Sequence, residues 1–144
     1  MLSPLPDQFE DIRIIDLDTN RTYNPDPVKK LYNVYLKLSA PPPADWAQIF
    51  DSERQFPRHS MWRRAWVEGL YIVVHAPLEE IEKCHVPDLR EDVQKTNSKY
   101  RAYLTQKAAA EVEEGAFRGR EREEIDELRK KLGFGEEGDG ESSE

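Results

Sequence analysis

Residues 32–39 read YNVYLKLS, and this stretch decides the fold because it is the clearest strand in the sequence. Every second position is apolar and the positions between are mostly polar, which is typical of a strand that buries one face. The apolar side chains are Tyr32, Val34, Leu36 and Leu38. Three consecutive prolines at 41–43 end the strand, because proline cannot donate to a sheet ladder.

Two further strands and a helix are predicted before and after this stretch in the sequence. Residues 44–53 place Trp46, Ile49 and Phe50 on one stripe, which predicts an amphipathic helix. Residues 65–76 (AWVEGLYIVVHA) predict a single strand, of which residues 70–74 are apolar on both faces. Residues 11–18 (DIRIIDLD) predict a short first strand with imperfect alternation.

The order of these elements predicts an α+β fold. A strand, a helix and a strand of this size are typical of a small sheet with helices on one face. We expect a three-stranded mixed sheet packed against two or three helices, followed by a charged helical C-terminal extension. The first strand is expected between the other two, in a split β-α-β-like arrangement.

The sequence of the second half of the chain predicts helices whose apolar content decreases towards the C-terminus. Residues 88–108 repeat apolar side chains at helical spacing, and Gly115 and Gly119 are expected to interrupt that helix. Beyond them the sequence is strongly charged and ends in glycine, serine and acidic residues, which favour disorder. The predicted organisation is an α+β core domain over 1–112, a charged amphipathic helix over 113–134 and a disordered acidic tail over 135–144.

Composition limits the compartment and the partners of this acidic protein. The net charge is -8 and the mean hydropathy is -0.84, so most of the surface repels nucleic acid and anionic lipid. The sequence contains no apolar run long enough to span a membrane. The first ten residues do not resemble a secretory signal, and the single cysteine, Cys84, cannot form an internal disulfide. We therefore expect a cytoplasmic protein.

The segment 54–66 (RQFPRHSMWRRAW) is the sharpest local feature, because four arginines and two tryptophans occur in it without an acid. Arginines clamp carboxylates or phosphates and aromatic rings stack on flat partners, so the segment could bind a protein partner, a nucleic acid or another anion. In the structural alternative, the tryptophans anchor the core and the arginines pair with acids of the C-terminal helices. The candidate partner- or anion-binding residues are Arg54, Arg58, His59, Trp62, Arg63 and Arg64.

Residues for catalysis or metal binding are few. The histidines and Cys84 follow no zinc-ligand spacing, so we predict no metal site and no cofactor. Cys84 with His75 or His85 is the only thiol and imidazole set that suggests a nucleophile, and no glycine-rich nucleophile turn or phosphate loop accompanies it. Asn97, on the long predicted helix, is expected to belong to a solvated polar face.

Three functional hypotheses follow. The first is a small, non-catalytic protein-binding or adaptor module, because no catalytic constellation accompanies the aromatic and basic segment. The second is nucleic-acid or other anion binding through residues 54–66, against which the net charge argues. The third is an enzyme that uses Cys84 and His75 or His85.

The two apolar faces of the strand predicted at 65–76 raise the question of self-association. Leu70, Ile72 and Val74 would lie on one face, and Val67, Tyr71 and Val73 on the other. Helices on one side of a sheet cover only one face. The second face therefore needs the C-terminal helix, a loop or a second copy of the chain, and both a monomer and a homodimer remain open.

Overall fold

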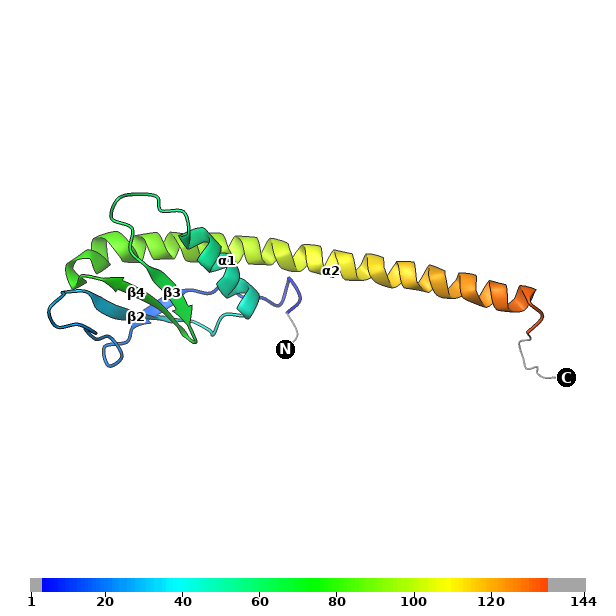
Figure 1. Ribbon diagram of the computed structural model, residues 1–144, viewed down its shortest axis with the longest axis horizontal. Coiled ribbons are helices and arrows are strands. Elements are labelled where there is room, and N and C mark those ends of the chain that lie inside the picture. Colours follow the sequence, from blue (N-terminus) through cyan, green and yellow to red (C-terminus); the bar gives the residue numbers. More distant parts are fainter. Residues whose placement is uncertain (1–3, 135–144) are drawn as a thin grey trace. The chain divides into compact units, whose positions relative to one another are not determined.

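The computed structural model describes residues 4–134 and confirms the α+β fold (Figure 1). Contacts divide the chain into two compact units, Met1–Leu104 and Thr105–Glu144. The elements are strands β1 (Ile14–Leu17) and β2 (Tyr32–Leu38), helix α1 (Ala44–Arg54), strands β3 (Ala65–Glu68) and β4 (Tyr71–Ala76), a 3-10 turn η1 (Leu78–Glu80), a π-helical turn η2 (Ile81–His85) and helix α2 (Val86–Lys131).

The sheet differs from the prediction in its number of strands and in their directions. Its four strands are in the order β1-β2-β4-β3, and each neighbouring pair is antiparallel. The predicted three-stranded mixed sheet is therefore wrong. β2 and β3 run in the same direction, but β4 lies between them. The first strand was expected between the other two, but β1 lies at the edge of the sheet beside β2.

A hairpin at Gly69 accounts for this difference. Residues 65–76 were predicted as one strand, but Gly69 has a φ of +59° and turns the chain between β3 and β4. Glycine adopts this conformation readily, and glycine at the first position of a two-residue loop is typical of tight hairpins. The register then pairs Val67 with Ile72, so that Val67 packs against the core instead of sharing the opposite face with Val73.

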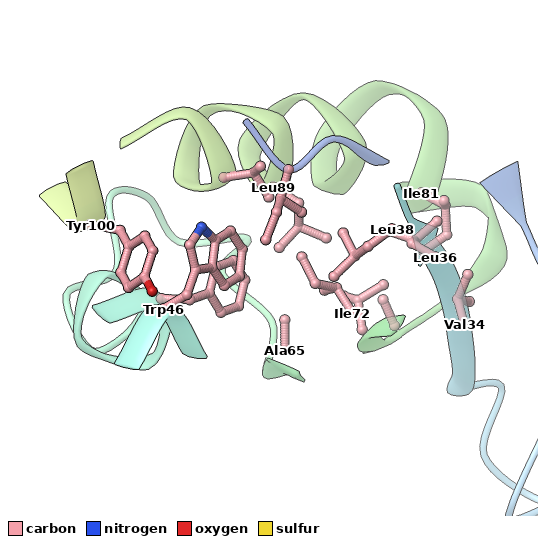
Figure 2. Close-up of a cluster of buried hydrophobic side chains, with 14 of the residues drawn as sticks. Val34, Leu36, Leu38, Trp46, Ala65, Ile72, Ile81, Leu89 and Tyr100 are labelled. Atoms are coloured by element: carbon pink, nitrogen blue, oxygen red, sulfur yellow. The ribbon is translucent and has the colours of Figure 1, made fainter. Parts of the chain in front are cut away.

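The core lies between one face of the sheet and the two helices (Figure 2). α1 contributes Trp46 and Phe50, whose rings stack with centroids 5.7 Å apart, as its apolar stripe predicts. From the sheet, alternate residues of β2 and β4 point to the same side. Other buried members are Val34, Leu36, Leu38, Ile72, Val74, Leu89, Val93, Tyr100 and Leu104.

Asn97 lies in this core, which corrects the expectation of a solvated polar position. Its Oδ1 accepts from the Ile12 amide at 3.1 Å and from the Trp46 indole at 2.9 Å, and its Nδ2 donates to the Ile12 carbonyl at 2.9 Å. One amide therefore satisfies three buried polar groups on the N-terminal arm and α1. The helical spacing of residues in the sequence does not distinguish a buried asparagine that bonds to other elements from an asparagine on the surface.

α2 runs without a break through Gly115 and Gly119, so the expected interruption is wrong. Each glycine costs only about 1 kcal/mol in a helix, which a long run of good helix formers offsets. Leu104 is the last buried residue among those described, and residues 109–134 are all exposed. The predicted domain ranges remain a prediction, and the predicted disordered tail at 135–144 lies outside the described residues.

Within residues 4–134, no helix combines the length and the apolar character that crossing a membrane requires.

Candidate functional site

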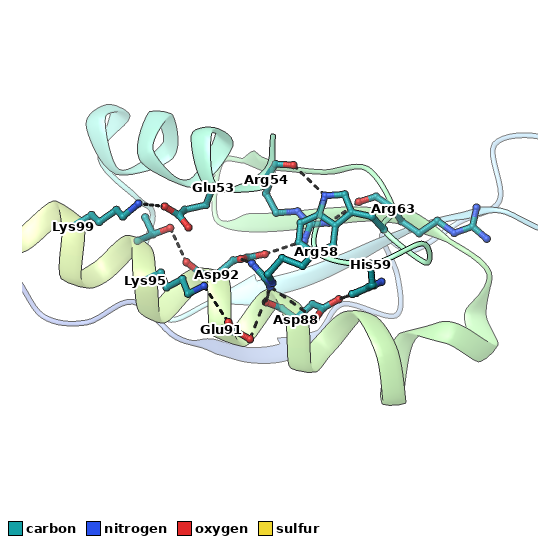
Figure 3. Close-up of polar contacts among 12 residues, drawn as sticks. Glu53, Arg54, Arg58, His59, Arg63, Asp88, Glu91, Asp92, Lys95 and Lys99 are labelled. Carbon is teal, nitrogen blue, oxygen red and sulfur yellow. Dashed lines mark hydrogen bonds and ion pairs between the residues drawn. The ribbon is translucent and has the colours of Figure 1, made fainter. Parts of the chain in front are cut away.

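Arg54, the first candidate of the basic segment, is buried in a polar cluster between the end of α1 and the N-terminal part of α2 (Figure 3). Its Nη1 donates to Asp92 Oδ2 at 2.9 Å, and its Nη2 donates to the Arg63 carbonyl at 2.5 Å. The guanidinium carbon lies 3.8 Å from the centre of the Trp62 ring, and the Trp62 indole donates to the Arg54 carbonyl at 3.0 Å. Burial lowers the pKa of Arg54, while the bond to Asp92 opposes that effect.

Arg58 and Arg63 are also paired with acids. Arg58 donates to Asp92 Oδ1 at 2.6 Å, so the fully buried Asp92 carboxylate receives two guanidinium groups. Arg63 makes a bidentate contact with Glu80, and both of its hydrogen bonds measure 3.0 Å. These bonds, together with one from His85, lower the pKa of Glu80 to about 2.

These pairings bear directly on the anion-binding hypothesis. A guanidinium that already holds a carboxylate bidentately has little remaining capacity for a phosphate. Arg63 holds Glu80 in this way, and Arg54 and Arg58 each donate to Asp92 through one nitrogen. Three of the four candidate arginines therefore have acidic partners within the chain, in the manner of the structural alternative. Arg64 differs, because it is exposed and its guanidinium carbon lies 4.6 Å above the ring of Trp66. Arg64 and Trp66 point to the face of the sheet opposite the helices, as the pairing of Trp66 with Val73 requires.

The remaining candidate, His59, meets two residues that the sequence did not connect with it. Its Nε2 lies 2.5 Å from Asp88 Oδ2, and its Nδ1 accepts from the Met61 amide at 3.1 Å. A ligand atom of His59, the Cys84 sulfur and an Asp88 oxygen all lie within 4.8 Å of one another. Spacing in the sequence gave no sign of this cluster, because His59 precedes Cys84 by a whole hairpin.

The cluster does not have the geometry of a cysteine–histidine–aspartate triad. In such a triad, one ring nitrogen holds the acid while the other faces the thiol. Here Nε2 faces Asp88 and Nδ1 is engaged by a backbone amide. In addition, burial raises the pKa of Cys84, and Asp88 and Glu80 raise it further. Both effects oppose formation of a reactive thiolate.

The other two histidines have hydrogen-bond partners of their own. His75 Nδ1 lies 2.7 Å from Asn33 Oδ1 on the sheet, and His85 Nε2 lies 2.8 Å from Glu80 Oε1. The structure therefore brings Cys84 together with His59 rather than with the two histidines that the enzyme hypothesis named.

A second surface is the sheet face opposite the helices, here called the aromatic face and defined by Arg21, Tyr35, Arg64, Trp66 and Tyr71. Tyr35 and Tyr71 meet edge to face with ring centres 5.6 Å apart. Arg21 lies over Tyr71 at 5.0 Å, and Arg64 lies over Trp66. The three rings are half-buried and therefore present part of their surface to solvent.

Hydrogen bonds to acids fix the rings of the aromatic face. Tyr71 donates to Asp18 at 2.8 Å, while Tyr35 and the Trp66 indole each donate to Glu68 at 3.2 Å. The bond to Asp18 raises the pKa of Tyr71, and burial raises that of Tyr35. Each ring is therefore held in one orientation as a neutral hydrogen-bond donor.

Val73 shows how this face is partly covered. It is fully buried although it points away from the helices, and its cross-strand partners are Tyr35 and Trp66. Val73 is therefore buried within the single chain, on the face that also carries Tyr35 and Trp66. Tyr35 and Arg21 were not among the candidates predicted from the sequence, because their position near Trp66 depends on strand order.

No protein-family model, curated protein or solved structure matches the chain.

Proposed function

We propose that the protein is a non-catalytic protein-binding module, and that the aromatic face is its contact surface. The observation that carries the proposal is the composition of that face. Tryptophan, tyrosine and arginine dominate the energetics of protein–protein interfaces, and this surface combines one tryptophan, two tyrosines and two arginines on a rigid sheet.

Pre-organisation supports the same proposal. The bonds to Asp18 and Glu68 fix the aromatic rings before any partner arrives. Binding then costs little side-chain entropy, since rings with two rotatable bonds are already ordered. The exposed guanidinium of Arg64 is available at the rim for a carboxylate or a carbonyl of the partner.

The charges of the face favour a protein partner over a nucleic acid. Arg21 and Arg64 are offset by Asp18 and Glu68, so the surface has no excess of positive charge to attract phosphates. The rest of the chain carries a net negative charge. A mixed, balanced surface with aromatic anchors is typical of protein interfaces.

The test compares two arginine reversals that are matched in chemistry. Arg64→Glu changes the aromatic face, whereas Arg90→Glu changes an exposed position on α2. A partner is first captured with the wild-type chain from cells that produce it and is then titrated against each purified variant. We expect Arg64→Glu to weaken binding by about 30-fold, the equivalent of a hot-spot loss of about 2 kcal/mol, and Arg90→Glu to leave binding nearly unchanged.

Two results would overturn this assignment. Equal affinity of the wild type and Arg64→Glu would place the contact surface elsewhere, provided that both chains melt at the same temperature. Tight binding of single-stranded RNA or duplex DNA, with an affinity that falls steeply as salt rises, would favour the nucleic-acid hypothesis instead.

A further inference from the structure

The fold brings one thiol, one imidazole and one carboxylate together at the start of α2. Cys84 lies in the π-helical turn η2, and Asp88 follows four residues later in the first turn of α2. Residues four apart on a helix point to the same side, so both reach the same neighbour. That neighbour is His59, whose ring is held edge to face against Trp62 at 5.4 Å. Single π-helical turns in proteins are frequently found at functional sites.

We propose that His59, Cys84 and Asp88 form a binding site for a zinc ion. Their ligand atoms already lie within 4.8 Å of one another. Tetrahedral coordination with bonds of about 2.0–2.3 Å places ligand atoms about 3.3–3.8 Å apart. The longest separation in the cluster therefore has to shorten by about 1 Å, and the 2.5 Å between His59 Nε2 and Asp88 Oδ2 has to lengthen by about 1 Å. His59 lies on an exposed loop, where a movement of this size disturbs no core packing.

The donor set selects zinc over the common hard cations. A thiolate and an imidazole are ligands of zinc and of other late first-row metals, whereas calcium and magnesium require oxygen ligands throughout. Three protein ligands leave the fourth position of a tetrahedral ion to water. The site is therefore expected to bind Zn²⁺ or Co²⁺ and not to bind Mg²⁺.

Charge at the site is matched to a divalent cation. A thiolate and the Asp88 carboxylate supply two negative charges, which neutralise the metal. Arg58 Nη2 lies 3.8 Å from Asp88 Oδ1, the oxygen not directed at His59, and can orient the carboxylate from behind.

Metal binding displaces two protons from their present positions. The thiol proton leaves to solvent as the Cys84 sulfur binds. The ring proton, which Nε2 holds while Nδ1 accepts from the Met61 amide, moves to Nδ1 so that Nε2 can coordinate. The Met61 amide lies on the exposed loop and then donates to water.

Cobalt titration of the full-length protein tests this site with one unambiguous signal. Because Cys84 is the only cysteine, a sulfur-to-cobalt charge-transfer band can come from no other residue. We expect the band to appear at one equivalent of Co²⁺, to be bleached by one equivalent of Zn²⁺ and to persist in excess Mg²⁺. Zinc should also raise the melting temperature, because it ties the loop to α2.

Three variants distinguish a built site from a lone thiol. Cys84→Ser should abolish the band, and His59→Ala and Asp88→Asn should each weaken cobalt binding by at least 10-fold. His75→Gln is the matched control, because His75 bonds to Asn33 and lies outside the cluster, and it should bind cobalt like the wild type. Absence of a band in the wild type, or a band of equal affinity in His59→Ala and Asp88→Asn, would overturn the proposal.

Discussion

Asp92 provides the sharpest test of the polar cluster between α1 and α2. Its carboxylate is fully buried and receives Arg54 at 2.9 Å and Arg58 at 2.6 Å. Asp92→Asn keeps the shape of the side chain but removes its charge. The guanidinium of Arg54, whose side chain is only 6% exposed, then loses its counter-ion.

The expected cost follows from that burial. Breaking a buried ion pair by removing one partner destabilises a protein by about 3–5 kcal/mol, because the remaining charge stays uncompensated. Arg54 Nε has no hydrogen-bond partner among the described residues, which adds to the strain on this guanidinium. In a domain of about 100 residues, 1 kcal/mol corresponds to about 4–8 °C, so the melting temperature should fall by at least about 12 °C.

Urea unfolding followed by tryptophan fluorescence measures this change, with Glu91→Gln as the matched control. Glu91 is the neighbouring acid, and its ion pairs with Arg58 and Lys95 are at the surface, so its neutralisation should cost less than about 1 kcal/mol. A second variant that replaces Arg54 by Met and Asp92 by Leu should recover most of the lost stability. If Asp92→Asn and Glu91→Gln cost the same, the buried cluster does not stabilise the fold as described.

Three further changes test other parts of the structure. Asn97→Ala should lower the free energy of unfolding by about 2–4 kcal/mol in urea titration, because it leaves the Trp46 indole and a buried backbone unit unpaired; a loss below about 1 kcal/mol would contradict this role. The pKa of Glu80 lies at about 2 instead of 4.5, so its ionised form stabilises the fold above pH 4.5, and this contribution is lost as the pH falls towards 2. Glu80→Gln should therefore lower the free energy of unfolding by about 1–2 kcal/mol at pH 7, allowing for the partial exposure of Arg63. The difference in unfolding free energy between the variant and the wild type should shrink in acid, and a difference that does not change with pH would contradict the assignment. Removing all residues after 112 should change the melting temperature by less than about 3 °C, since Leu104 is the last buried residue described, and a larger fall would show that the rest of the helix docks on the core.

The predictable part of the fold was the part governed by local periodicity. β2 alternates apolar and polar residues because one face packs on the helices, and the sequence of this strand shows that pattern directly. The stripe of Trp46, Ile49 and Phe50 likewise identified α1. Short-range patterns of this kind need no knowledge of the rest of the chain.

Strand order was not predictable in the same way, because one glycine decided it. A largely apolar stretch such as residues 65–76, which Glu68 and Gly69 interrupt, is compatible with one long strand or with a hairpin. The positive φ of Gly69 settles the matter, and it makes β4 the neighbour of both β2 and β3. The mixed, split arrangement followed from missing that turn.

The candidate sites likewise combine features that local sequence shows with features that only tertiary contacts reveal. The arginines of residues 54–66 were identified from composition, but their partners Asp92 and Glu80 lie 38 and 17 residues away from Arg54 and Arg63. Sequence alone does not show which acids fold back on which arginines. The aromatic face and the His59 cluster likewise depend on tertiary contacts.

The most direct measurement for the proposed function is site-specific photo-crosslinking in cells that produce the protein. A photoreactive phenylalanine analogue replaces Tyr35 on the aromatic face, and separate chains carry it at Glu91 or at Ile125, which are both exposed. We expect position 35 to give a protein adduct of discrete mass, which disappears when Arg64→Glu is added. Adducts from position 125 or 91 with none from position 35 would contradict the assignment of the aromatic face as the contact surface.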